Sequence, residues 1–126
     1  MAELPSMNAS EIELVRQIAS SDSDRPVLLL NLNKYTPEAH YPQGALYRDY
    51  MSVLDRLLSE VGGSILWRTA VLGQVVGGQD IDEALGIWYP SHQAFMNLMS
   101  APSSSDNMRL RALAVERADL HRCQPY

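Results

Sequence analysis

The chain has 126 residues, 46% of them hydrophobic, and a formal net charge of -5. This size fits one domain that buries roughly two thirds of its unfolded surface. The acidic balance, with Lys34 as the only lysine, argues against nucleic acid as a partner, because a phosphate-binding face needs clustered Lys and Arg. The single cysteine, Cys123, excludes an internal disulfide and a cysteine-based zinc site.

Segment 1–25 is expected to be a helical extension that precedes the main domain at 26–126. Ser10 and Glu13 have the spacing of a capping box, which predicts a helix start there. The segment lacks the basic start and apolar core of a signal peptide, and the longest apolar runs are too short to cross a bilayer. With no disulfide to form, the sequence predicts a cytoplasmic protein that has no contact with a membrane.

The next elements follow from apolar periodicity and from Gly and Pro positions. The run after Pro26 predicts a strand at 27–34, and an apolar face at helical spacing predicts a helix at 45–61 that ends at Gly62 and Gly63. Residues 64–78 are rich in strand formers and predict one long strand with a bend at Gly73. The remaining expected elements are a short strand at 83–89, a helix from His92 capped by Ser91, a helix at about 107–113 capped by Asp106, and a fourth strand within 115–126.

Without its leading helix, this order is strand, helix, strand, strand, helix, strand. It predicts an α+β fold of the ferredoxin-like type, an antiparallel sheet with both helices on one face. The other face is then open, and it is expected to carry Val27, Leu29, Trp67 or Trp88 as an apolar patch. We expect a homodimer in which two such sheets pack together.

Two stretches resemble domain-of-unknown-function family 1330, in the dimeric α+β barrel superfamily. They are "VLLLNLNKYTPEAHYPQGALYRDYMSVLDRLLSEVGGSILWR" and "ALGIWYPSHQAFMNLMSAP", and the resemblance covers about residues 26–123. It implies a homodimer with a cavity between each sheet and its helices. The superfamily includes cofactor-free monooxygenases, lactone isomerases, cyclases and haem enzymes, so the fold alone selects no reaction. Trp88 stands where the family pattern has an acidic residue, which argues against a carboxylate-based mechanism.

Three polar residues form the candidate ligand site. Asn31 and Asn33 are two apart on the first strand and project from one face among leucines. They either bind a ligand or hydrogen-bond to backbone at the strand end or the dimer interface. Arg68, on the adjacent predicted strand, matches the family's arginine and could hold a carboxylate or enolate. The alternative for Arg68 is a salt bridge to Asp49, Asp55 or Asp119.

Aromatic residues and one histidine complete the candidates. Tyr47 and Tyr50 share one side of the first long helix, where they either face the ligand or belong to the core. Trp67 and Trp88 could wall an aromatic pocket, although packing within a dimer also explains them. His121 is the candidate acid or base. The three histidines lack the spacing of metal ligands, so we expect neither a metal nor another cofactor.

The leading hypothesis is a homodimer that binds a small aromatic, carbonyl or carboxylate compound. If it is an enzyme, we expect cofactor-independent isomerase or cyclase chemistry. Arg68 and the asparagines would stabilise an oxyanion, and His121 or Tyr50 would move the proton. The alternative is a non-catalytic dimeric module that binds a ligand or a protein. A third possibility, a haem or monooxygenase-like protein, needs His92 or His121 as an axial ligand.

Overall fold

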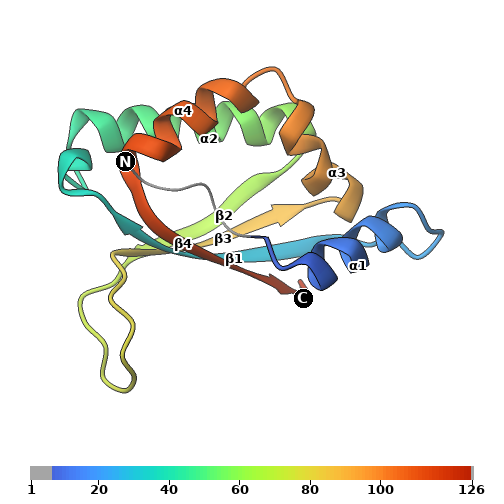
Figure 1. The fold of residues 1–126 in the computed structure, drawn as a ribbon, viewed down its shortest axis with the longest axis horizontal. Helices are drawn as coiled ribbons and strands as arrows, with labels where there is room; N and C mark the ends of the chain where they lie inside the picture. Colours follow the sequence, from blue (N-terminus) through green and yellow to red (C-terminus); the bar gives the residue numbers. More distant parts are fainter. Residues whose placement is uncertain (1–6, 126) are drawn as a thin grey trace.

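The computed structural model describes residues 7–125, which form a four-stranded antiparallel sheet with helices on one face (Figure 1). The strand order is β2-β3-β1-β4, which is the ferredoxin-like arrangement that the element order predicts. The elements are α1 (Ala9–Ala19), β1 (Val27–Tyr35), a 3₁₀ turn η1 (Pro37–Ala39), α2 (Ala45–Val61), β2 (Ser64–Ala70), β3 (Glu83–Tyr89), α3 (His92–Met96), a 3₁₀ turn η2 (Asn97–Ser100), α4 (Ser104–Ala114) and β4 (Val115–Cys123).

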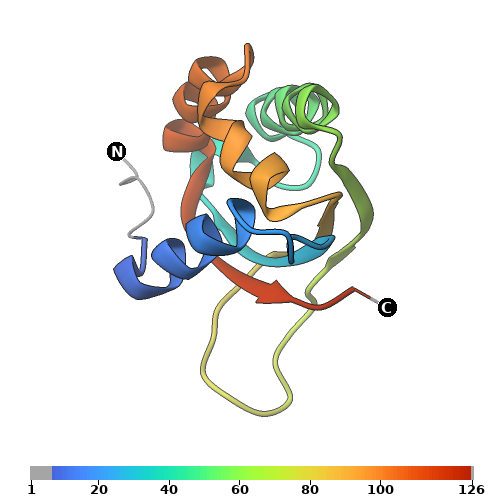
Figure 2. The same ribbon diagram turned by 90° about the vertical axis from the view of Figure 1, so that its right-hand side faces the viewer.

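The helices form a single layer over the sheet in two pairs. Helices α2 and α4 lie side by side over one part of it, and α1 lies beside α3 at the end where β1 begins (Figures 1 and 2). No helix of the described residues is long and apolar enough to cross a membrane. Because α1 lies beside α3, the helix that precedes the first strand covers the same face of the sheet as the two expected helices do.

The central strand β1 has one buried face and one partly exposed face. Val27 and Leu29 are buried beneath the helices, in line with Asn31 and Asn33. The expectation that Val27 and Leu29 lie on the open face is therefore wrong. The open face carries the alternate residues Leu28, Leu30 and Leu32 instead. Alternation alone shows that two sets of side chains face opposite ways, but it does not show which set meets the helices.

Both tryptophans lie on the open face, as expected. Trp88 is paired with Leu28 of β1, and Trp67 is paired with Gly86. A side-chain carbon added at Gly86 would overlap the Trp67 indole, so the ring lies directly over this glycine. Trp67 remains 45% exposed, which is typical of an aromatic residue on a surface without a covering layer.

The prediction of one long strand at 64–78 is wrong. Strand β2 ends at Ala70, and residues 71–82 form a loop that extends away from the sheet on the side opposite the helices (Figures 1 and 2). Gly73 lies in this loop with no atom near enough to crowd a side chain there, so it makes no bend within a strand. The register irregularity of β2 lies earlier, between Ile65 and Trp67.

The helix ends confirm two of the four predicted caps. Gly62 adopts the left-handed conformation that ends α2, with φ 82, and the Ser91 hydroxyl accepts the backbone N–H of Ala94 at 3.0 Å. Two cap predictions are wrong, because α1 begins one residue before Ser10 and α4 begins at Ser104, which places Asp106 inside its first turn. In both helices a hydroxyl or amide residue directly precedes the first turn.

Candidate functional site

A cavity of about 470 Å³ lies between the sheet and the helices. All four inward residues from Val27 to Asn33 on β1 line it, so it runs along much of the central strand. Most of its wall is apolar, including Leu29, Leu54, Leu85, Ile87, Tyr89 and Phe95. Its volume falls within the range of roughly 300–1,000 Å³ that is usual for small-molecule sites.

Four buried side-chain atoms in the described part of the chain have no hydrogen-bond partner, and all four belong to residues that line this cavity. They are Oδ1 of Asn31, Oδ1 of Asn33, Nε2 of His92 and Nδ2 of Asn107. Buried polar atoms in proteins nearly always have partners, and each one left unsatisfied costs about 1–3 kcal/mol. The unmet hydrogen-bonding capacity of the interior is therefore concentrated in a single cavity.

Asn33 is the first member of a buried hydrogen-bond chain that leads away from the cavity. Its Nδ2 donates to the hydroxyl of Tyr35 at 3.1 Å, and that hydroxyl donates to Oε1 of Glu83 at 2.6 Å. The Tyr47 hydroxyl also donates to the Glu83 carboxylate, at 2.9 and 3.0 Å. Burial, together with the neighbouring Glu83 carboxylate, raises the pKa of both Tyr35 and Tyr47, so these hydroxyls remain proton donors.

Arg68 lies at the far end of this chain rather than in the cavity. Its guanidinium donates to the Tyr47 hydroxyl at 3.3 Å, and the residue is not part of the cavity lining. It forms no salt bridge to Asp49, Asp55 or Asp119 among the described residues, so neither interpretation of Arg68 matches its position. Tyr47 is likewise outside the lining.

The cavity does contain an arginine, Arg111 of α4. It lies close enough to Tyr50 for its charge to oppose the effect of burial, which raises the pKa of the Tyr50 hydroxyl. Among residues 7–125, Arg111 forms no ion pair with an acidic side chain. A guanidinium without a counter-ion beside an apolar cavity can hold an anionic oxygen of a ligand.

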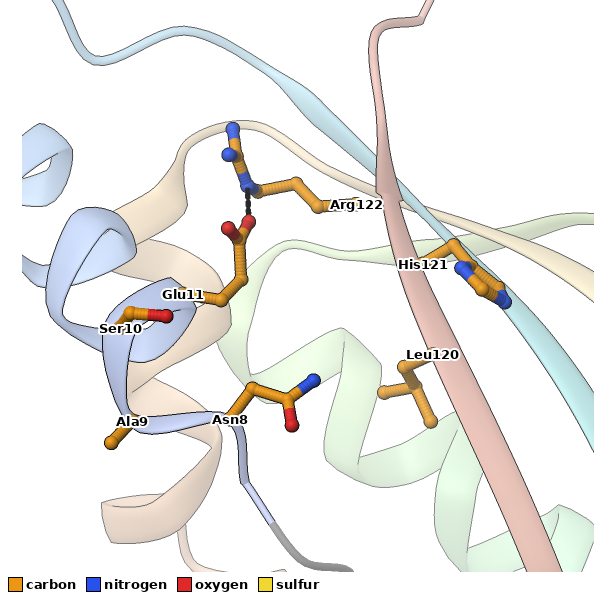
Figure 3. A pocket seen from close by; sticks show the side chains of 7 residues that line it. All are labelled: Asn8, Ala9, Ser10, Glu11, Leu120, His121 and Arg122. Carbon is orange, nitrogen blue, oxygen red and sulfur yellow. Dashed lines mark hydrogen bonds and ion pairs between the residues drawn. The ribbon is translucent and has the colours of Figure 1, made fainter.

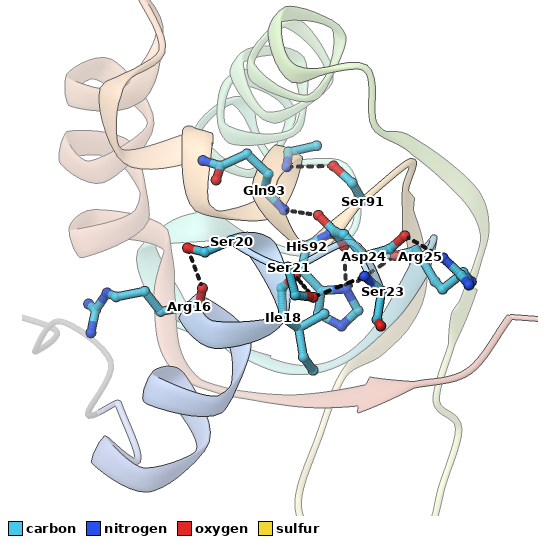
Figure 4. Close-up of polar contacts among 11 residues, drawn as sticks. Arg16, Ile18, Ser20, Ser21, Ser23, Asp24, Arg25, Ser91, His92 and Gln93 are labelled. Carbon is cyan, nitrogen blue, oxygen red and sulfur yellow. Dashed lines mark hydrogen bonds and ion pairs between the residues drawn. The ribbon is translucent and has the colours of Figure 1, made fainter.

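His92 and Asp24 form a second polar group, near the start of β1 (Figure 4). Nδ1 of His92 lies 2.9 Å from Oδ1 of Asp24 and 3.1 Å from the backbone oxygen of Arg25. Both neighbours are acceptors, so Nδ1 carries a proton, and Nε2 is the ring nitrogen without a partner in the described chain. The geometry is that of a histidine oriented by a carboxylate, with its second nitrogen buried at the cavity wall.

The two polar groups lie at opposite ends of the cavity. Asn33 is six positions along β1 from Val27, which corresponds to about 20 Å of extended chain. His92 contacts the backbone just before Val27, through the oxygen of Arg25. Asn33 and His92 therefore cannot act on the same atom of a small ligand.

The cavity reaches the surface between α1 and β4 (Figure 3). Asn8, which directly precedes α1, and Glu11 of α1 face Leu120 and Arg122 of β4 across a surface groove, and these four residues also line the cavity. The Glu11 carboxylate and Nε of Arg122 form an ion pair that joins the two elements. The N-terminal helix is therefore one wall of the entrance.

The other predicted site residues lie in several places. Asn31, Asn33 and Tyr50 line the cavity together. His121 is in the lining of both the entrance groove and the cavity, although it pairs with Leu30 of the open face and Figure 3 shows its ring on the opposite side of β4 from Leu120. Trp67 and Trp88 lie on the open face and not in the cavity.

Sequence patterns give little indication that His92, Asp24 and Arg111 belong to this site. Asp24 and His92 are far apart in the chain and belong to no spaced motif, so only the fold brings them together. The burial of Glu83, in contrast, could have been predicted, because its position alternates in phase with Leu85 and the other buried residues of β3. Within residues 7–125, no group of three or more His, Cys, Asp or Glu side chains could hold a metal ion.

No protein-family model and no curated protein matches the chain. Solved structures share its fold. A protein of unknown function from Rhodopseudomonas palustris has a TM-score of 0.76 and 23% identity over 100% of this chain and 98% of its own, and its methylated form has a TM-score of 0.76 and 24% identity, over 99% and 96%. A dabb family protein with a ferredoxin-like fold from Mesorhizobium loti has a TM-score of 0.58 and 12% identity over 81% of this chain and 98% of its own. At these identities the likeness establishes the ferredoxin-like fold and nothing further.

Proposed function

We propose that the protein binds a small organic molecule, aromatic and bearing a carbonyl or carboxylate group, in the cavity between its sheet and helices. One observation carries this proposal: the four buried side-chain atoms of residues 7–125 that have no partner all belong to residues that line one cavity. An occupant that supplies the missing partners removes a penalty of about 1–3 kcal/mol for each atom. The same four side chains would otherwise destabilise the fold for no gain.

The rest of the lining indicates the chemical class. The aromatic rings of Tyr89 and Phe95 and the aliphatic wall favour a flat apolar body. Arg111, without an acidic partner in the described chain, favours an oxygen anion. Tyr50 also lines the cavity, and its hydroxyl can donate a hydrogen bond to a ligand oxygen.

The test is a thermal-shift screen of the purified protein against small aromatic acids, lactones and polyketide fragments, with calorimetry on any compound that binds. A ligand at one hundred times its Kd should stabilise the fold by about 2.7 kcal/mol, which is several degrees in Tm for a domain of this size. Arg111→Met should weaken binding of the acids at least tenfold. Arg109→Met, on the exposed side of the same helix, should leave it unchanged. If no compound shifts the Tm, the proposal fails.

A second candidate function is catalysis of proton transfer without a cofactor, as in isomerases and cyclases. The specific observation that favours it is the Asp24–His92 pair, in which the carboxylate holds Nδ1 and so orients the ring with Nε2 as the nitrogen that can act as a base. In this proposal His92 takes the role that the sequence suggests for His121. A compound from the screen with acidic C–H groups should exchange them with heavy water when bound. His92→Gln should slow this exchange by about a hundredfold while binding persists, and equal rates would leave a binding protein without catalysis.

We infer that a second copy of the chain covers the open sheet face. Leu28, Leu30 and Leu32 with the two tryptophans form a continuous apolar surface there. The 71–82 loop extends beyond this face with Leu72 and Val75 almost wholly exposed, at 99% and 100%. Such side chains are usual in a segment that packs on a partner. A homodimer of this kind agrees with the resemblance to family 1330, which rests on sequence motifs alone.

Two further proposals concern the location of the protein in the cell and its domain organisation. The lone cysteine suits a reducing compartment, and we propose a cytoplasmic location. We also propose that residues 1–25 act as an extension to a domain formed by residues 26–126. The structure describes residues 7–25 of this extension, which include α1 and the turn after it. Because Ile12 and Val15 of α1 line the cavity, deletion of the extension should abolish ligand binding as well as any association with a partner protein.

A further inference from the structure

The direction of each hydrogen bond in the Asn33 chain is fixed by Glu83. A carboxylate only accepts, so the Tyr35 hydroxyl gives its single proton to Glu83 over 2.6 Å. The Tyr35 oxygen can then only accept from Asn33, which must present Nδ2 to it. An amide turned the other way would set two acceptors against each other. Asn33 is 4% exposed, so its amide lies in the interior of the protein.

It follows that Oδ1 of Asn33 is the acceptor of this amide that is left for a ligand. This atom is buried and has no partner in the described chain, and Asn33 lines the cavity. Asn31 and Asn107 also line it, but neither amide forms a side-chain hydrogen bond to another described residue, so either can turn to suit a donor or an acceptor. Among the three amides, Asn33 alone has its polarity fixed by a neighbour.

We propose that the cavity selects ligands that carry a hydrogen-bond donor, a hydroxyl or an N–H, at the point that meets Asn33. Combined with the anionic group favoured by Arg111, this identifies the ligand class as hydroxylated or amino-substituted aromatic acids. The inference rests on the proposed binding function and deepens it. Tyr35 and Glu83 are positioning residues in this account, because neither lines the cavity.

The experiment compares matched compounds by calorimetry on the purified protein. The set contains the positional isomers of hydroxynaphthoic acid, the aminonaphthoic acids with the same substitution patterns, and the matching methoxynaphthoic acids. The ether oxygen of the methoxy compounds accepts a hydrogen bond but cannot donate one. For the isomer that fits, the hydroxy and amino forms should bind at least tenfold more tightly than the methyl ether, because the ether leaves the Asn33 oxygen unpaired. Equal affinity of the three forms would overturn the inference while leaving the binding function intact.

Two Tyr→Phe variants test whether the preference arises from the fixed orientation of the Asn33 amide or from the size of the methyl group on the ligand. Tyr35→Phe removes the hydroxyl that holds the amide, so Asn33 can turn and the preference should fall to about twofold or less. Tyr47→Phe removes the other hydroxyl on Glu83 without touching Asn33, and should keep the full preference. A preference caused by the bulk of the methyl group would persist in Tyr35→Phe, and that result would also overturn the inference.

Glu83→Gln provides a second variant in case Tyr35→Phe does not fold. It keeps the size of the side chain, but its amide can donate to Tyr35, which frees the Tyr35 proton to turn toward Asn33. The preference for donors should fall in this variant too, and circular dichroism establishes that each variant is folded. Failure of every compound to bind the parent protein would reject the proposed function and this inference together.

Discussion

The Asp24 carboxylate accepts three hydrogen bonds from two consecutive residues, and one partner is the ring of His92. Its Oδ1 lies 2.7 Å from the backbone nitrogen of His92 and 2.9 Å from Nδ1 of the ring, and its Oδ2 accepts the backbone N–H of Gln93 at 3.2 Å. Asp24 therefore orients the His92 ring and also satisfies two donors in the first turn of α3. One carboxylate joins the turn after α1 to the start of α3.

The first prediction is a pH dependence of stability that belongs to Asp24. Burial opposes its ionisation, but the hydrogen bonds from His92 and Gln93 outweigh burial and hold the pKa of Asp24 below its ordinary value. A carboxyl with a lowered folded pKa stabilises the fold fully above its unfolded pKa of about 4, and the stabilisation disappears as the pH falls through the folded pKa. Asp24→Asn should therefore lower the free energy of unfolding by about 1.5 kcal/mol or more at pH 7, and by much less at pH 3.

Urea unfolding at the two pH values measures this difference. Asp22→Asn, an exposed residue of the same turn, serves as the control and should change stability little at either pH. A loss in Asp24→Asn that is the same at pH 3 and pH 7 would show that the carboxylate charge is not what stabilises α3.

The second prediction concerns the buried carboxylate of Glu83. Glu83→Leu leaves the hydroxyls of Tyr35 and Tyr47 without their acceptor inside the core, and we expect it to lower the free energy of unfolding by about 3 kcal/mol or more. Glu83→Gln retains an acceptor oxygen and should cost about 1 kcal/mol. Equal losses in the two variants, measured by urea unfolding, would contradict the hydrogen-bond chain.

The third prediction concerns the contact between Gly86 and Trp67. Gly86→Ala places a methyl group where the indole lies, so the ring must move, at a cost of about 1–3 kcal/mol in stability. The fluorescence emission of Trp67 should shift as well, which a Trp88→Phe background makes readable. Gly78→Ala is the matched control, because nothing lies within 4 Å of a side chain there.

The fourth prediction tests the 71–82 loop as a contact with a second copy. Leu72→Asp combined with Val75→Asp should convert a dimer to a monomer, because two charges would be buried at the interface without partners. Sedimentation analysis measures the mass in solution. Leu113→Asp, at a 50% exposed position on the helical side, should not change the mass. A parent protein that is monomeric at all accessible concentrations would remove the proposed interface.

The sequence predicted the order of strands and helices well, because apolar periodicity differs between the two. Strands β1, β3 and β4 lie where alternation placed them, and Gly62 ends α2 as predicted. Residues 71–78 were misassigned because Val and Leu favour strands by local preference alone. A strand also needs a neighbour to pair with. Val71 donates its backbone N–H to the oxygen of Asp82, but residues 72–78 pair with no strand of the described chain.

The sequence predicts part of the candidate site, and there are physical reasons why it does not predict the rest. Asn31 and Asn33 stood out because amides are unusual within an apolar strand, and both line the cavity. The sequence points to Arg68 because it lies on an adjacent strand and matches the arginine of family 1330, yet its side chain contacts Tyr47 and lies outside the cavity lining. His92 was assigned to a helix start because nothing in the local sequence indicates that Asp24 approaches it.

Two polar contacts join helix α1 and the turn after it to the rest of the molecule, and they differ in how they respond to salt. The Glu11–Arg122 ion pair is partly exposed at the entrance, so salt screens it, whereas the Asp24–His92 contact is largely buried and is screened far less. Added salt should therefore release the N-terminal end of α1 first, and the helix should swing about the turn that holds Asp24. The rates of ligand entry and escape should both rise with ionic strength, and a ligand without charge should keep nearly the same Kd.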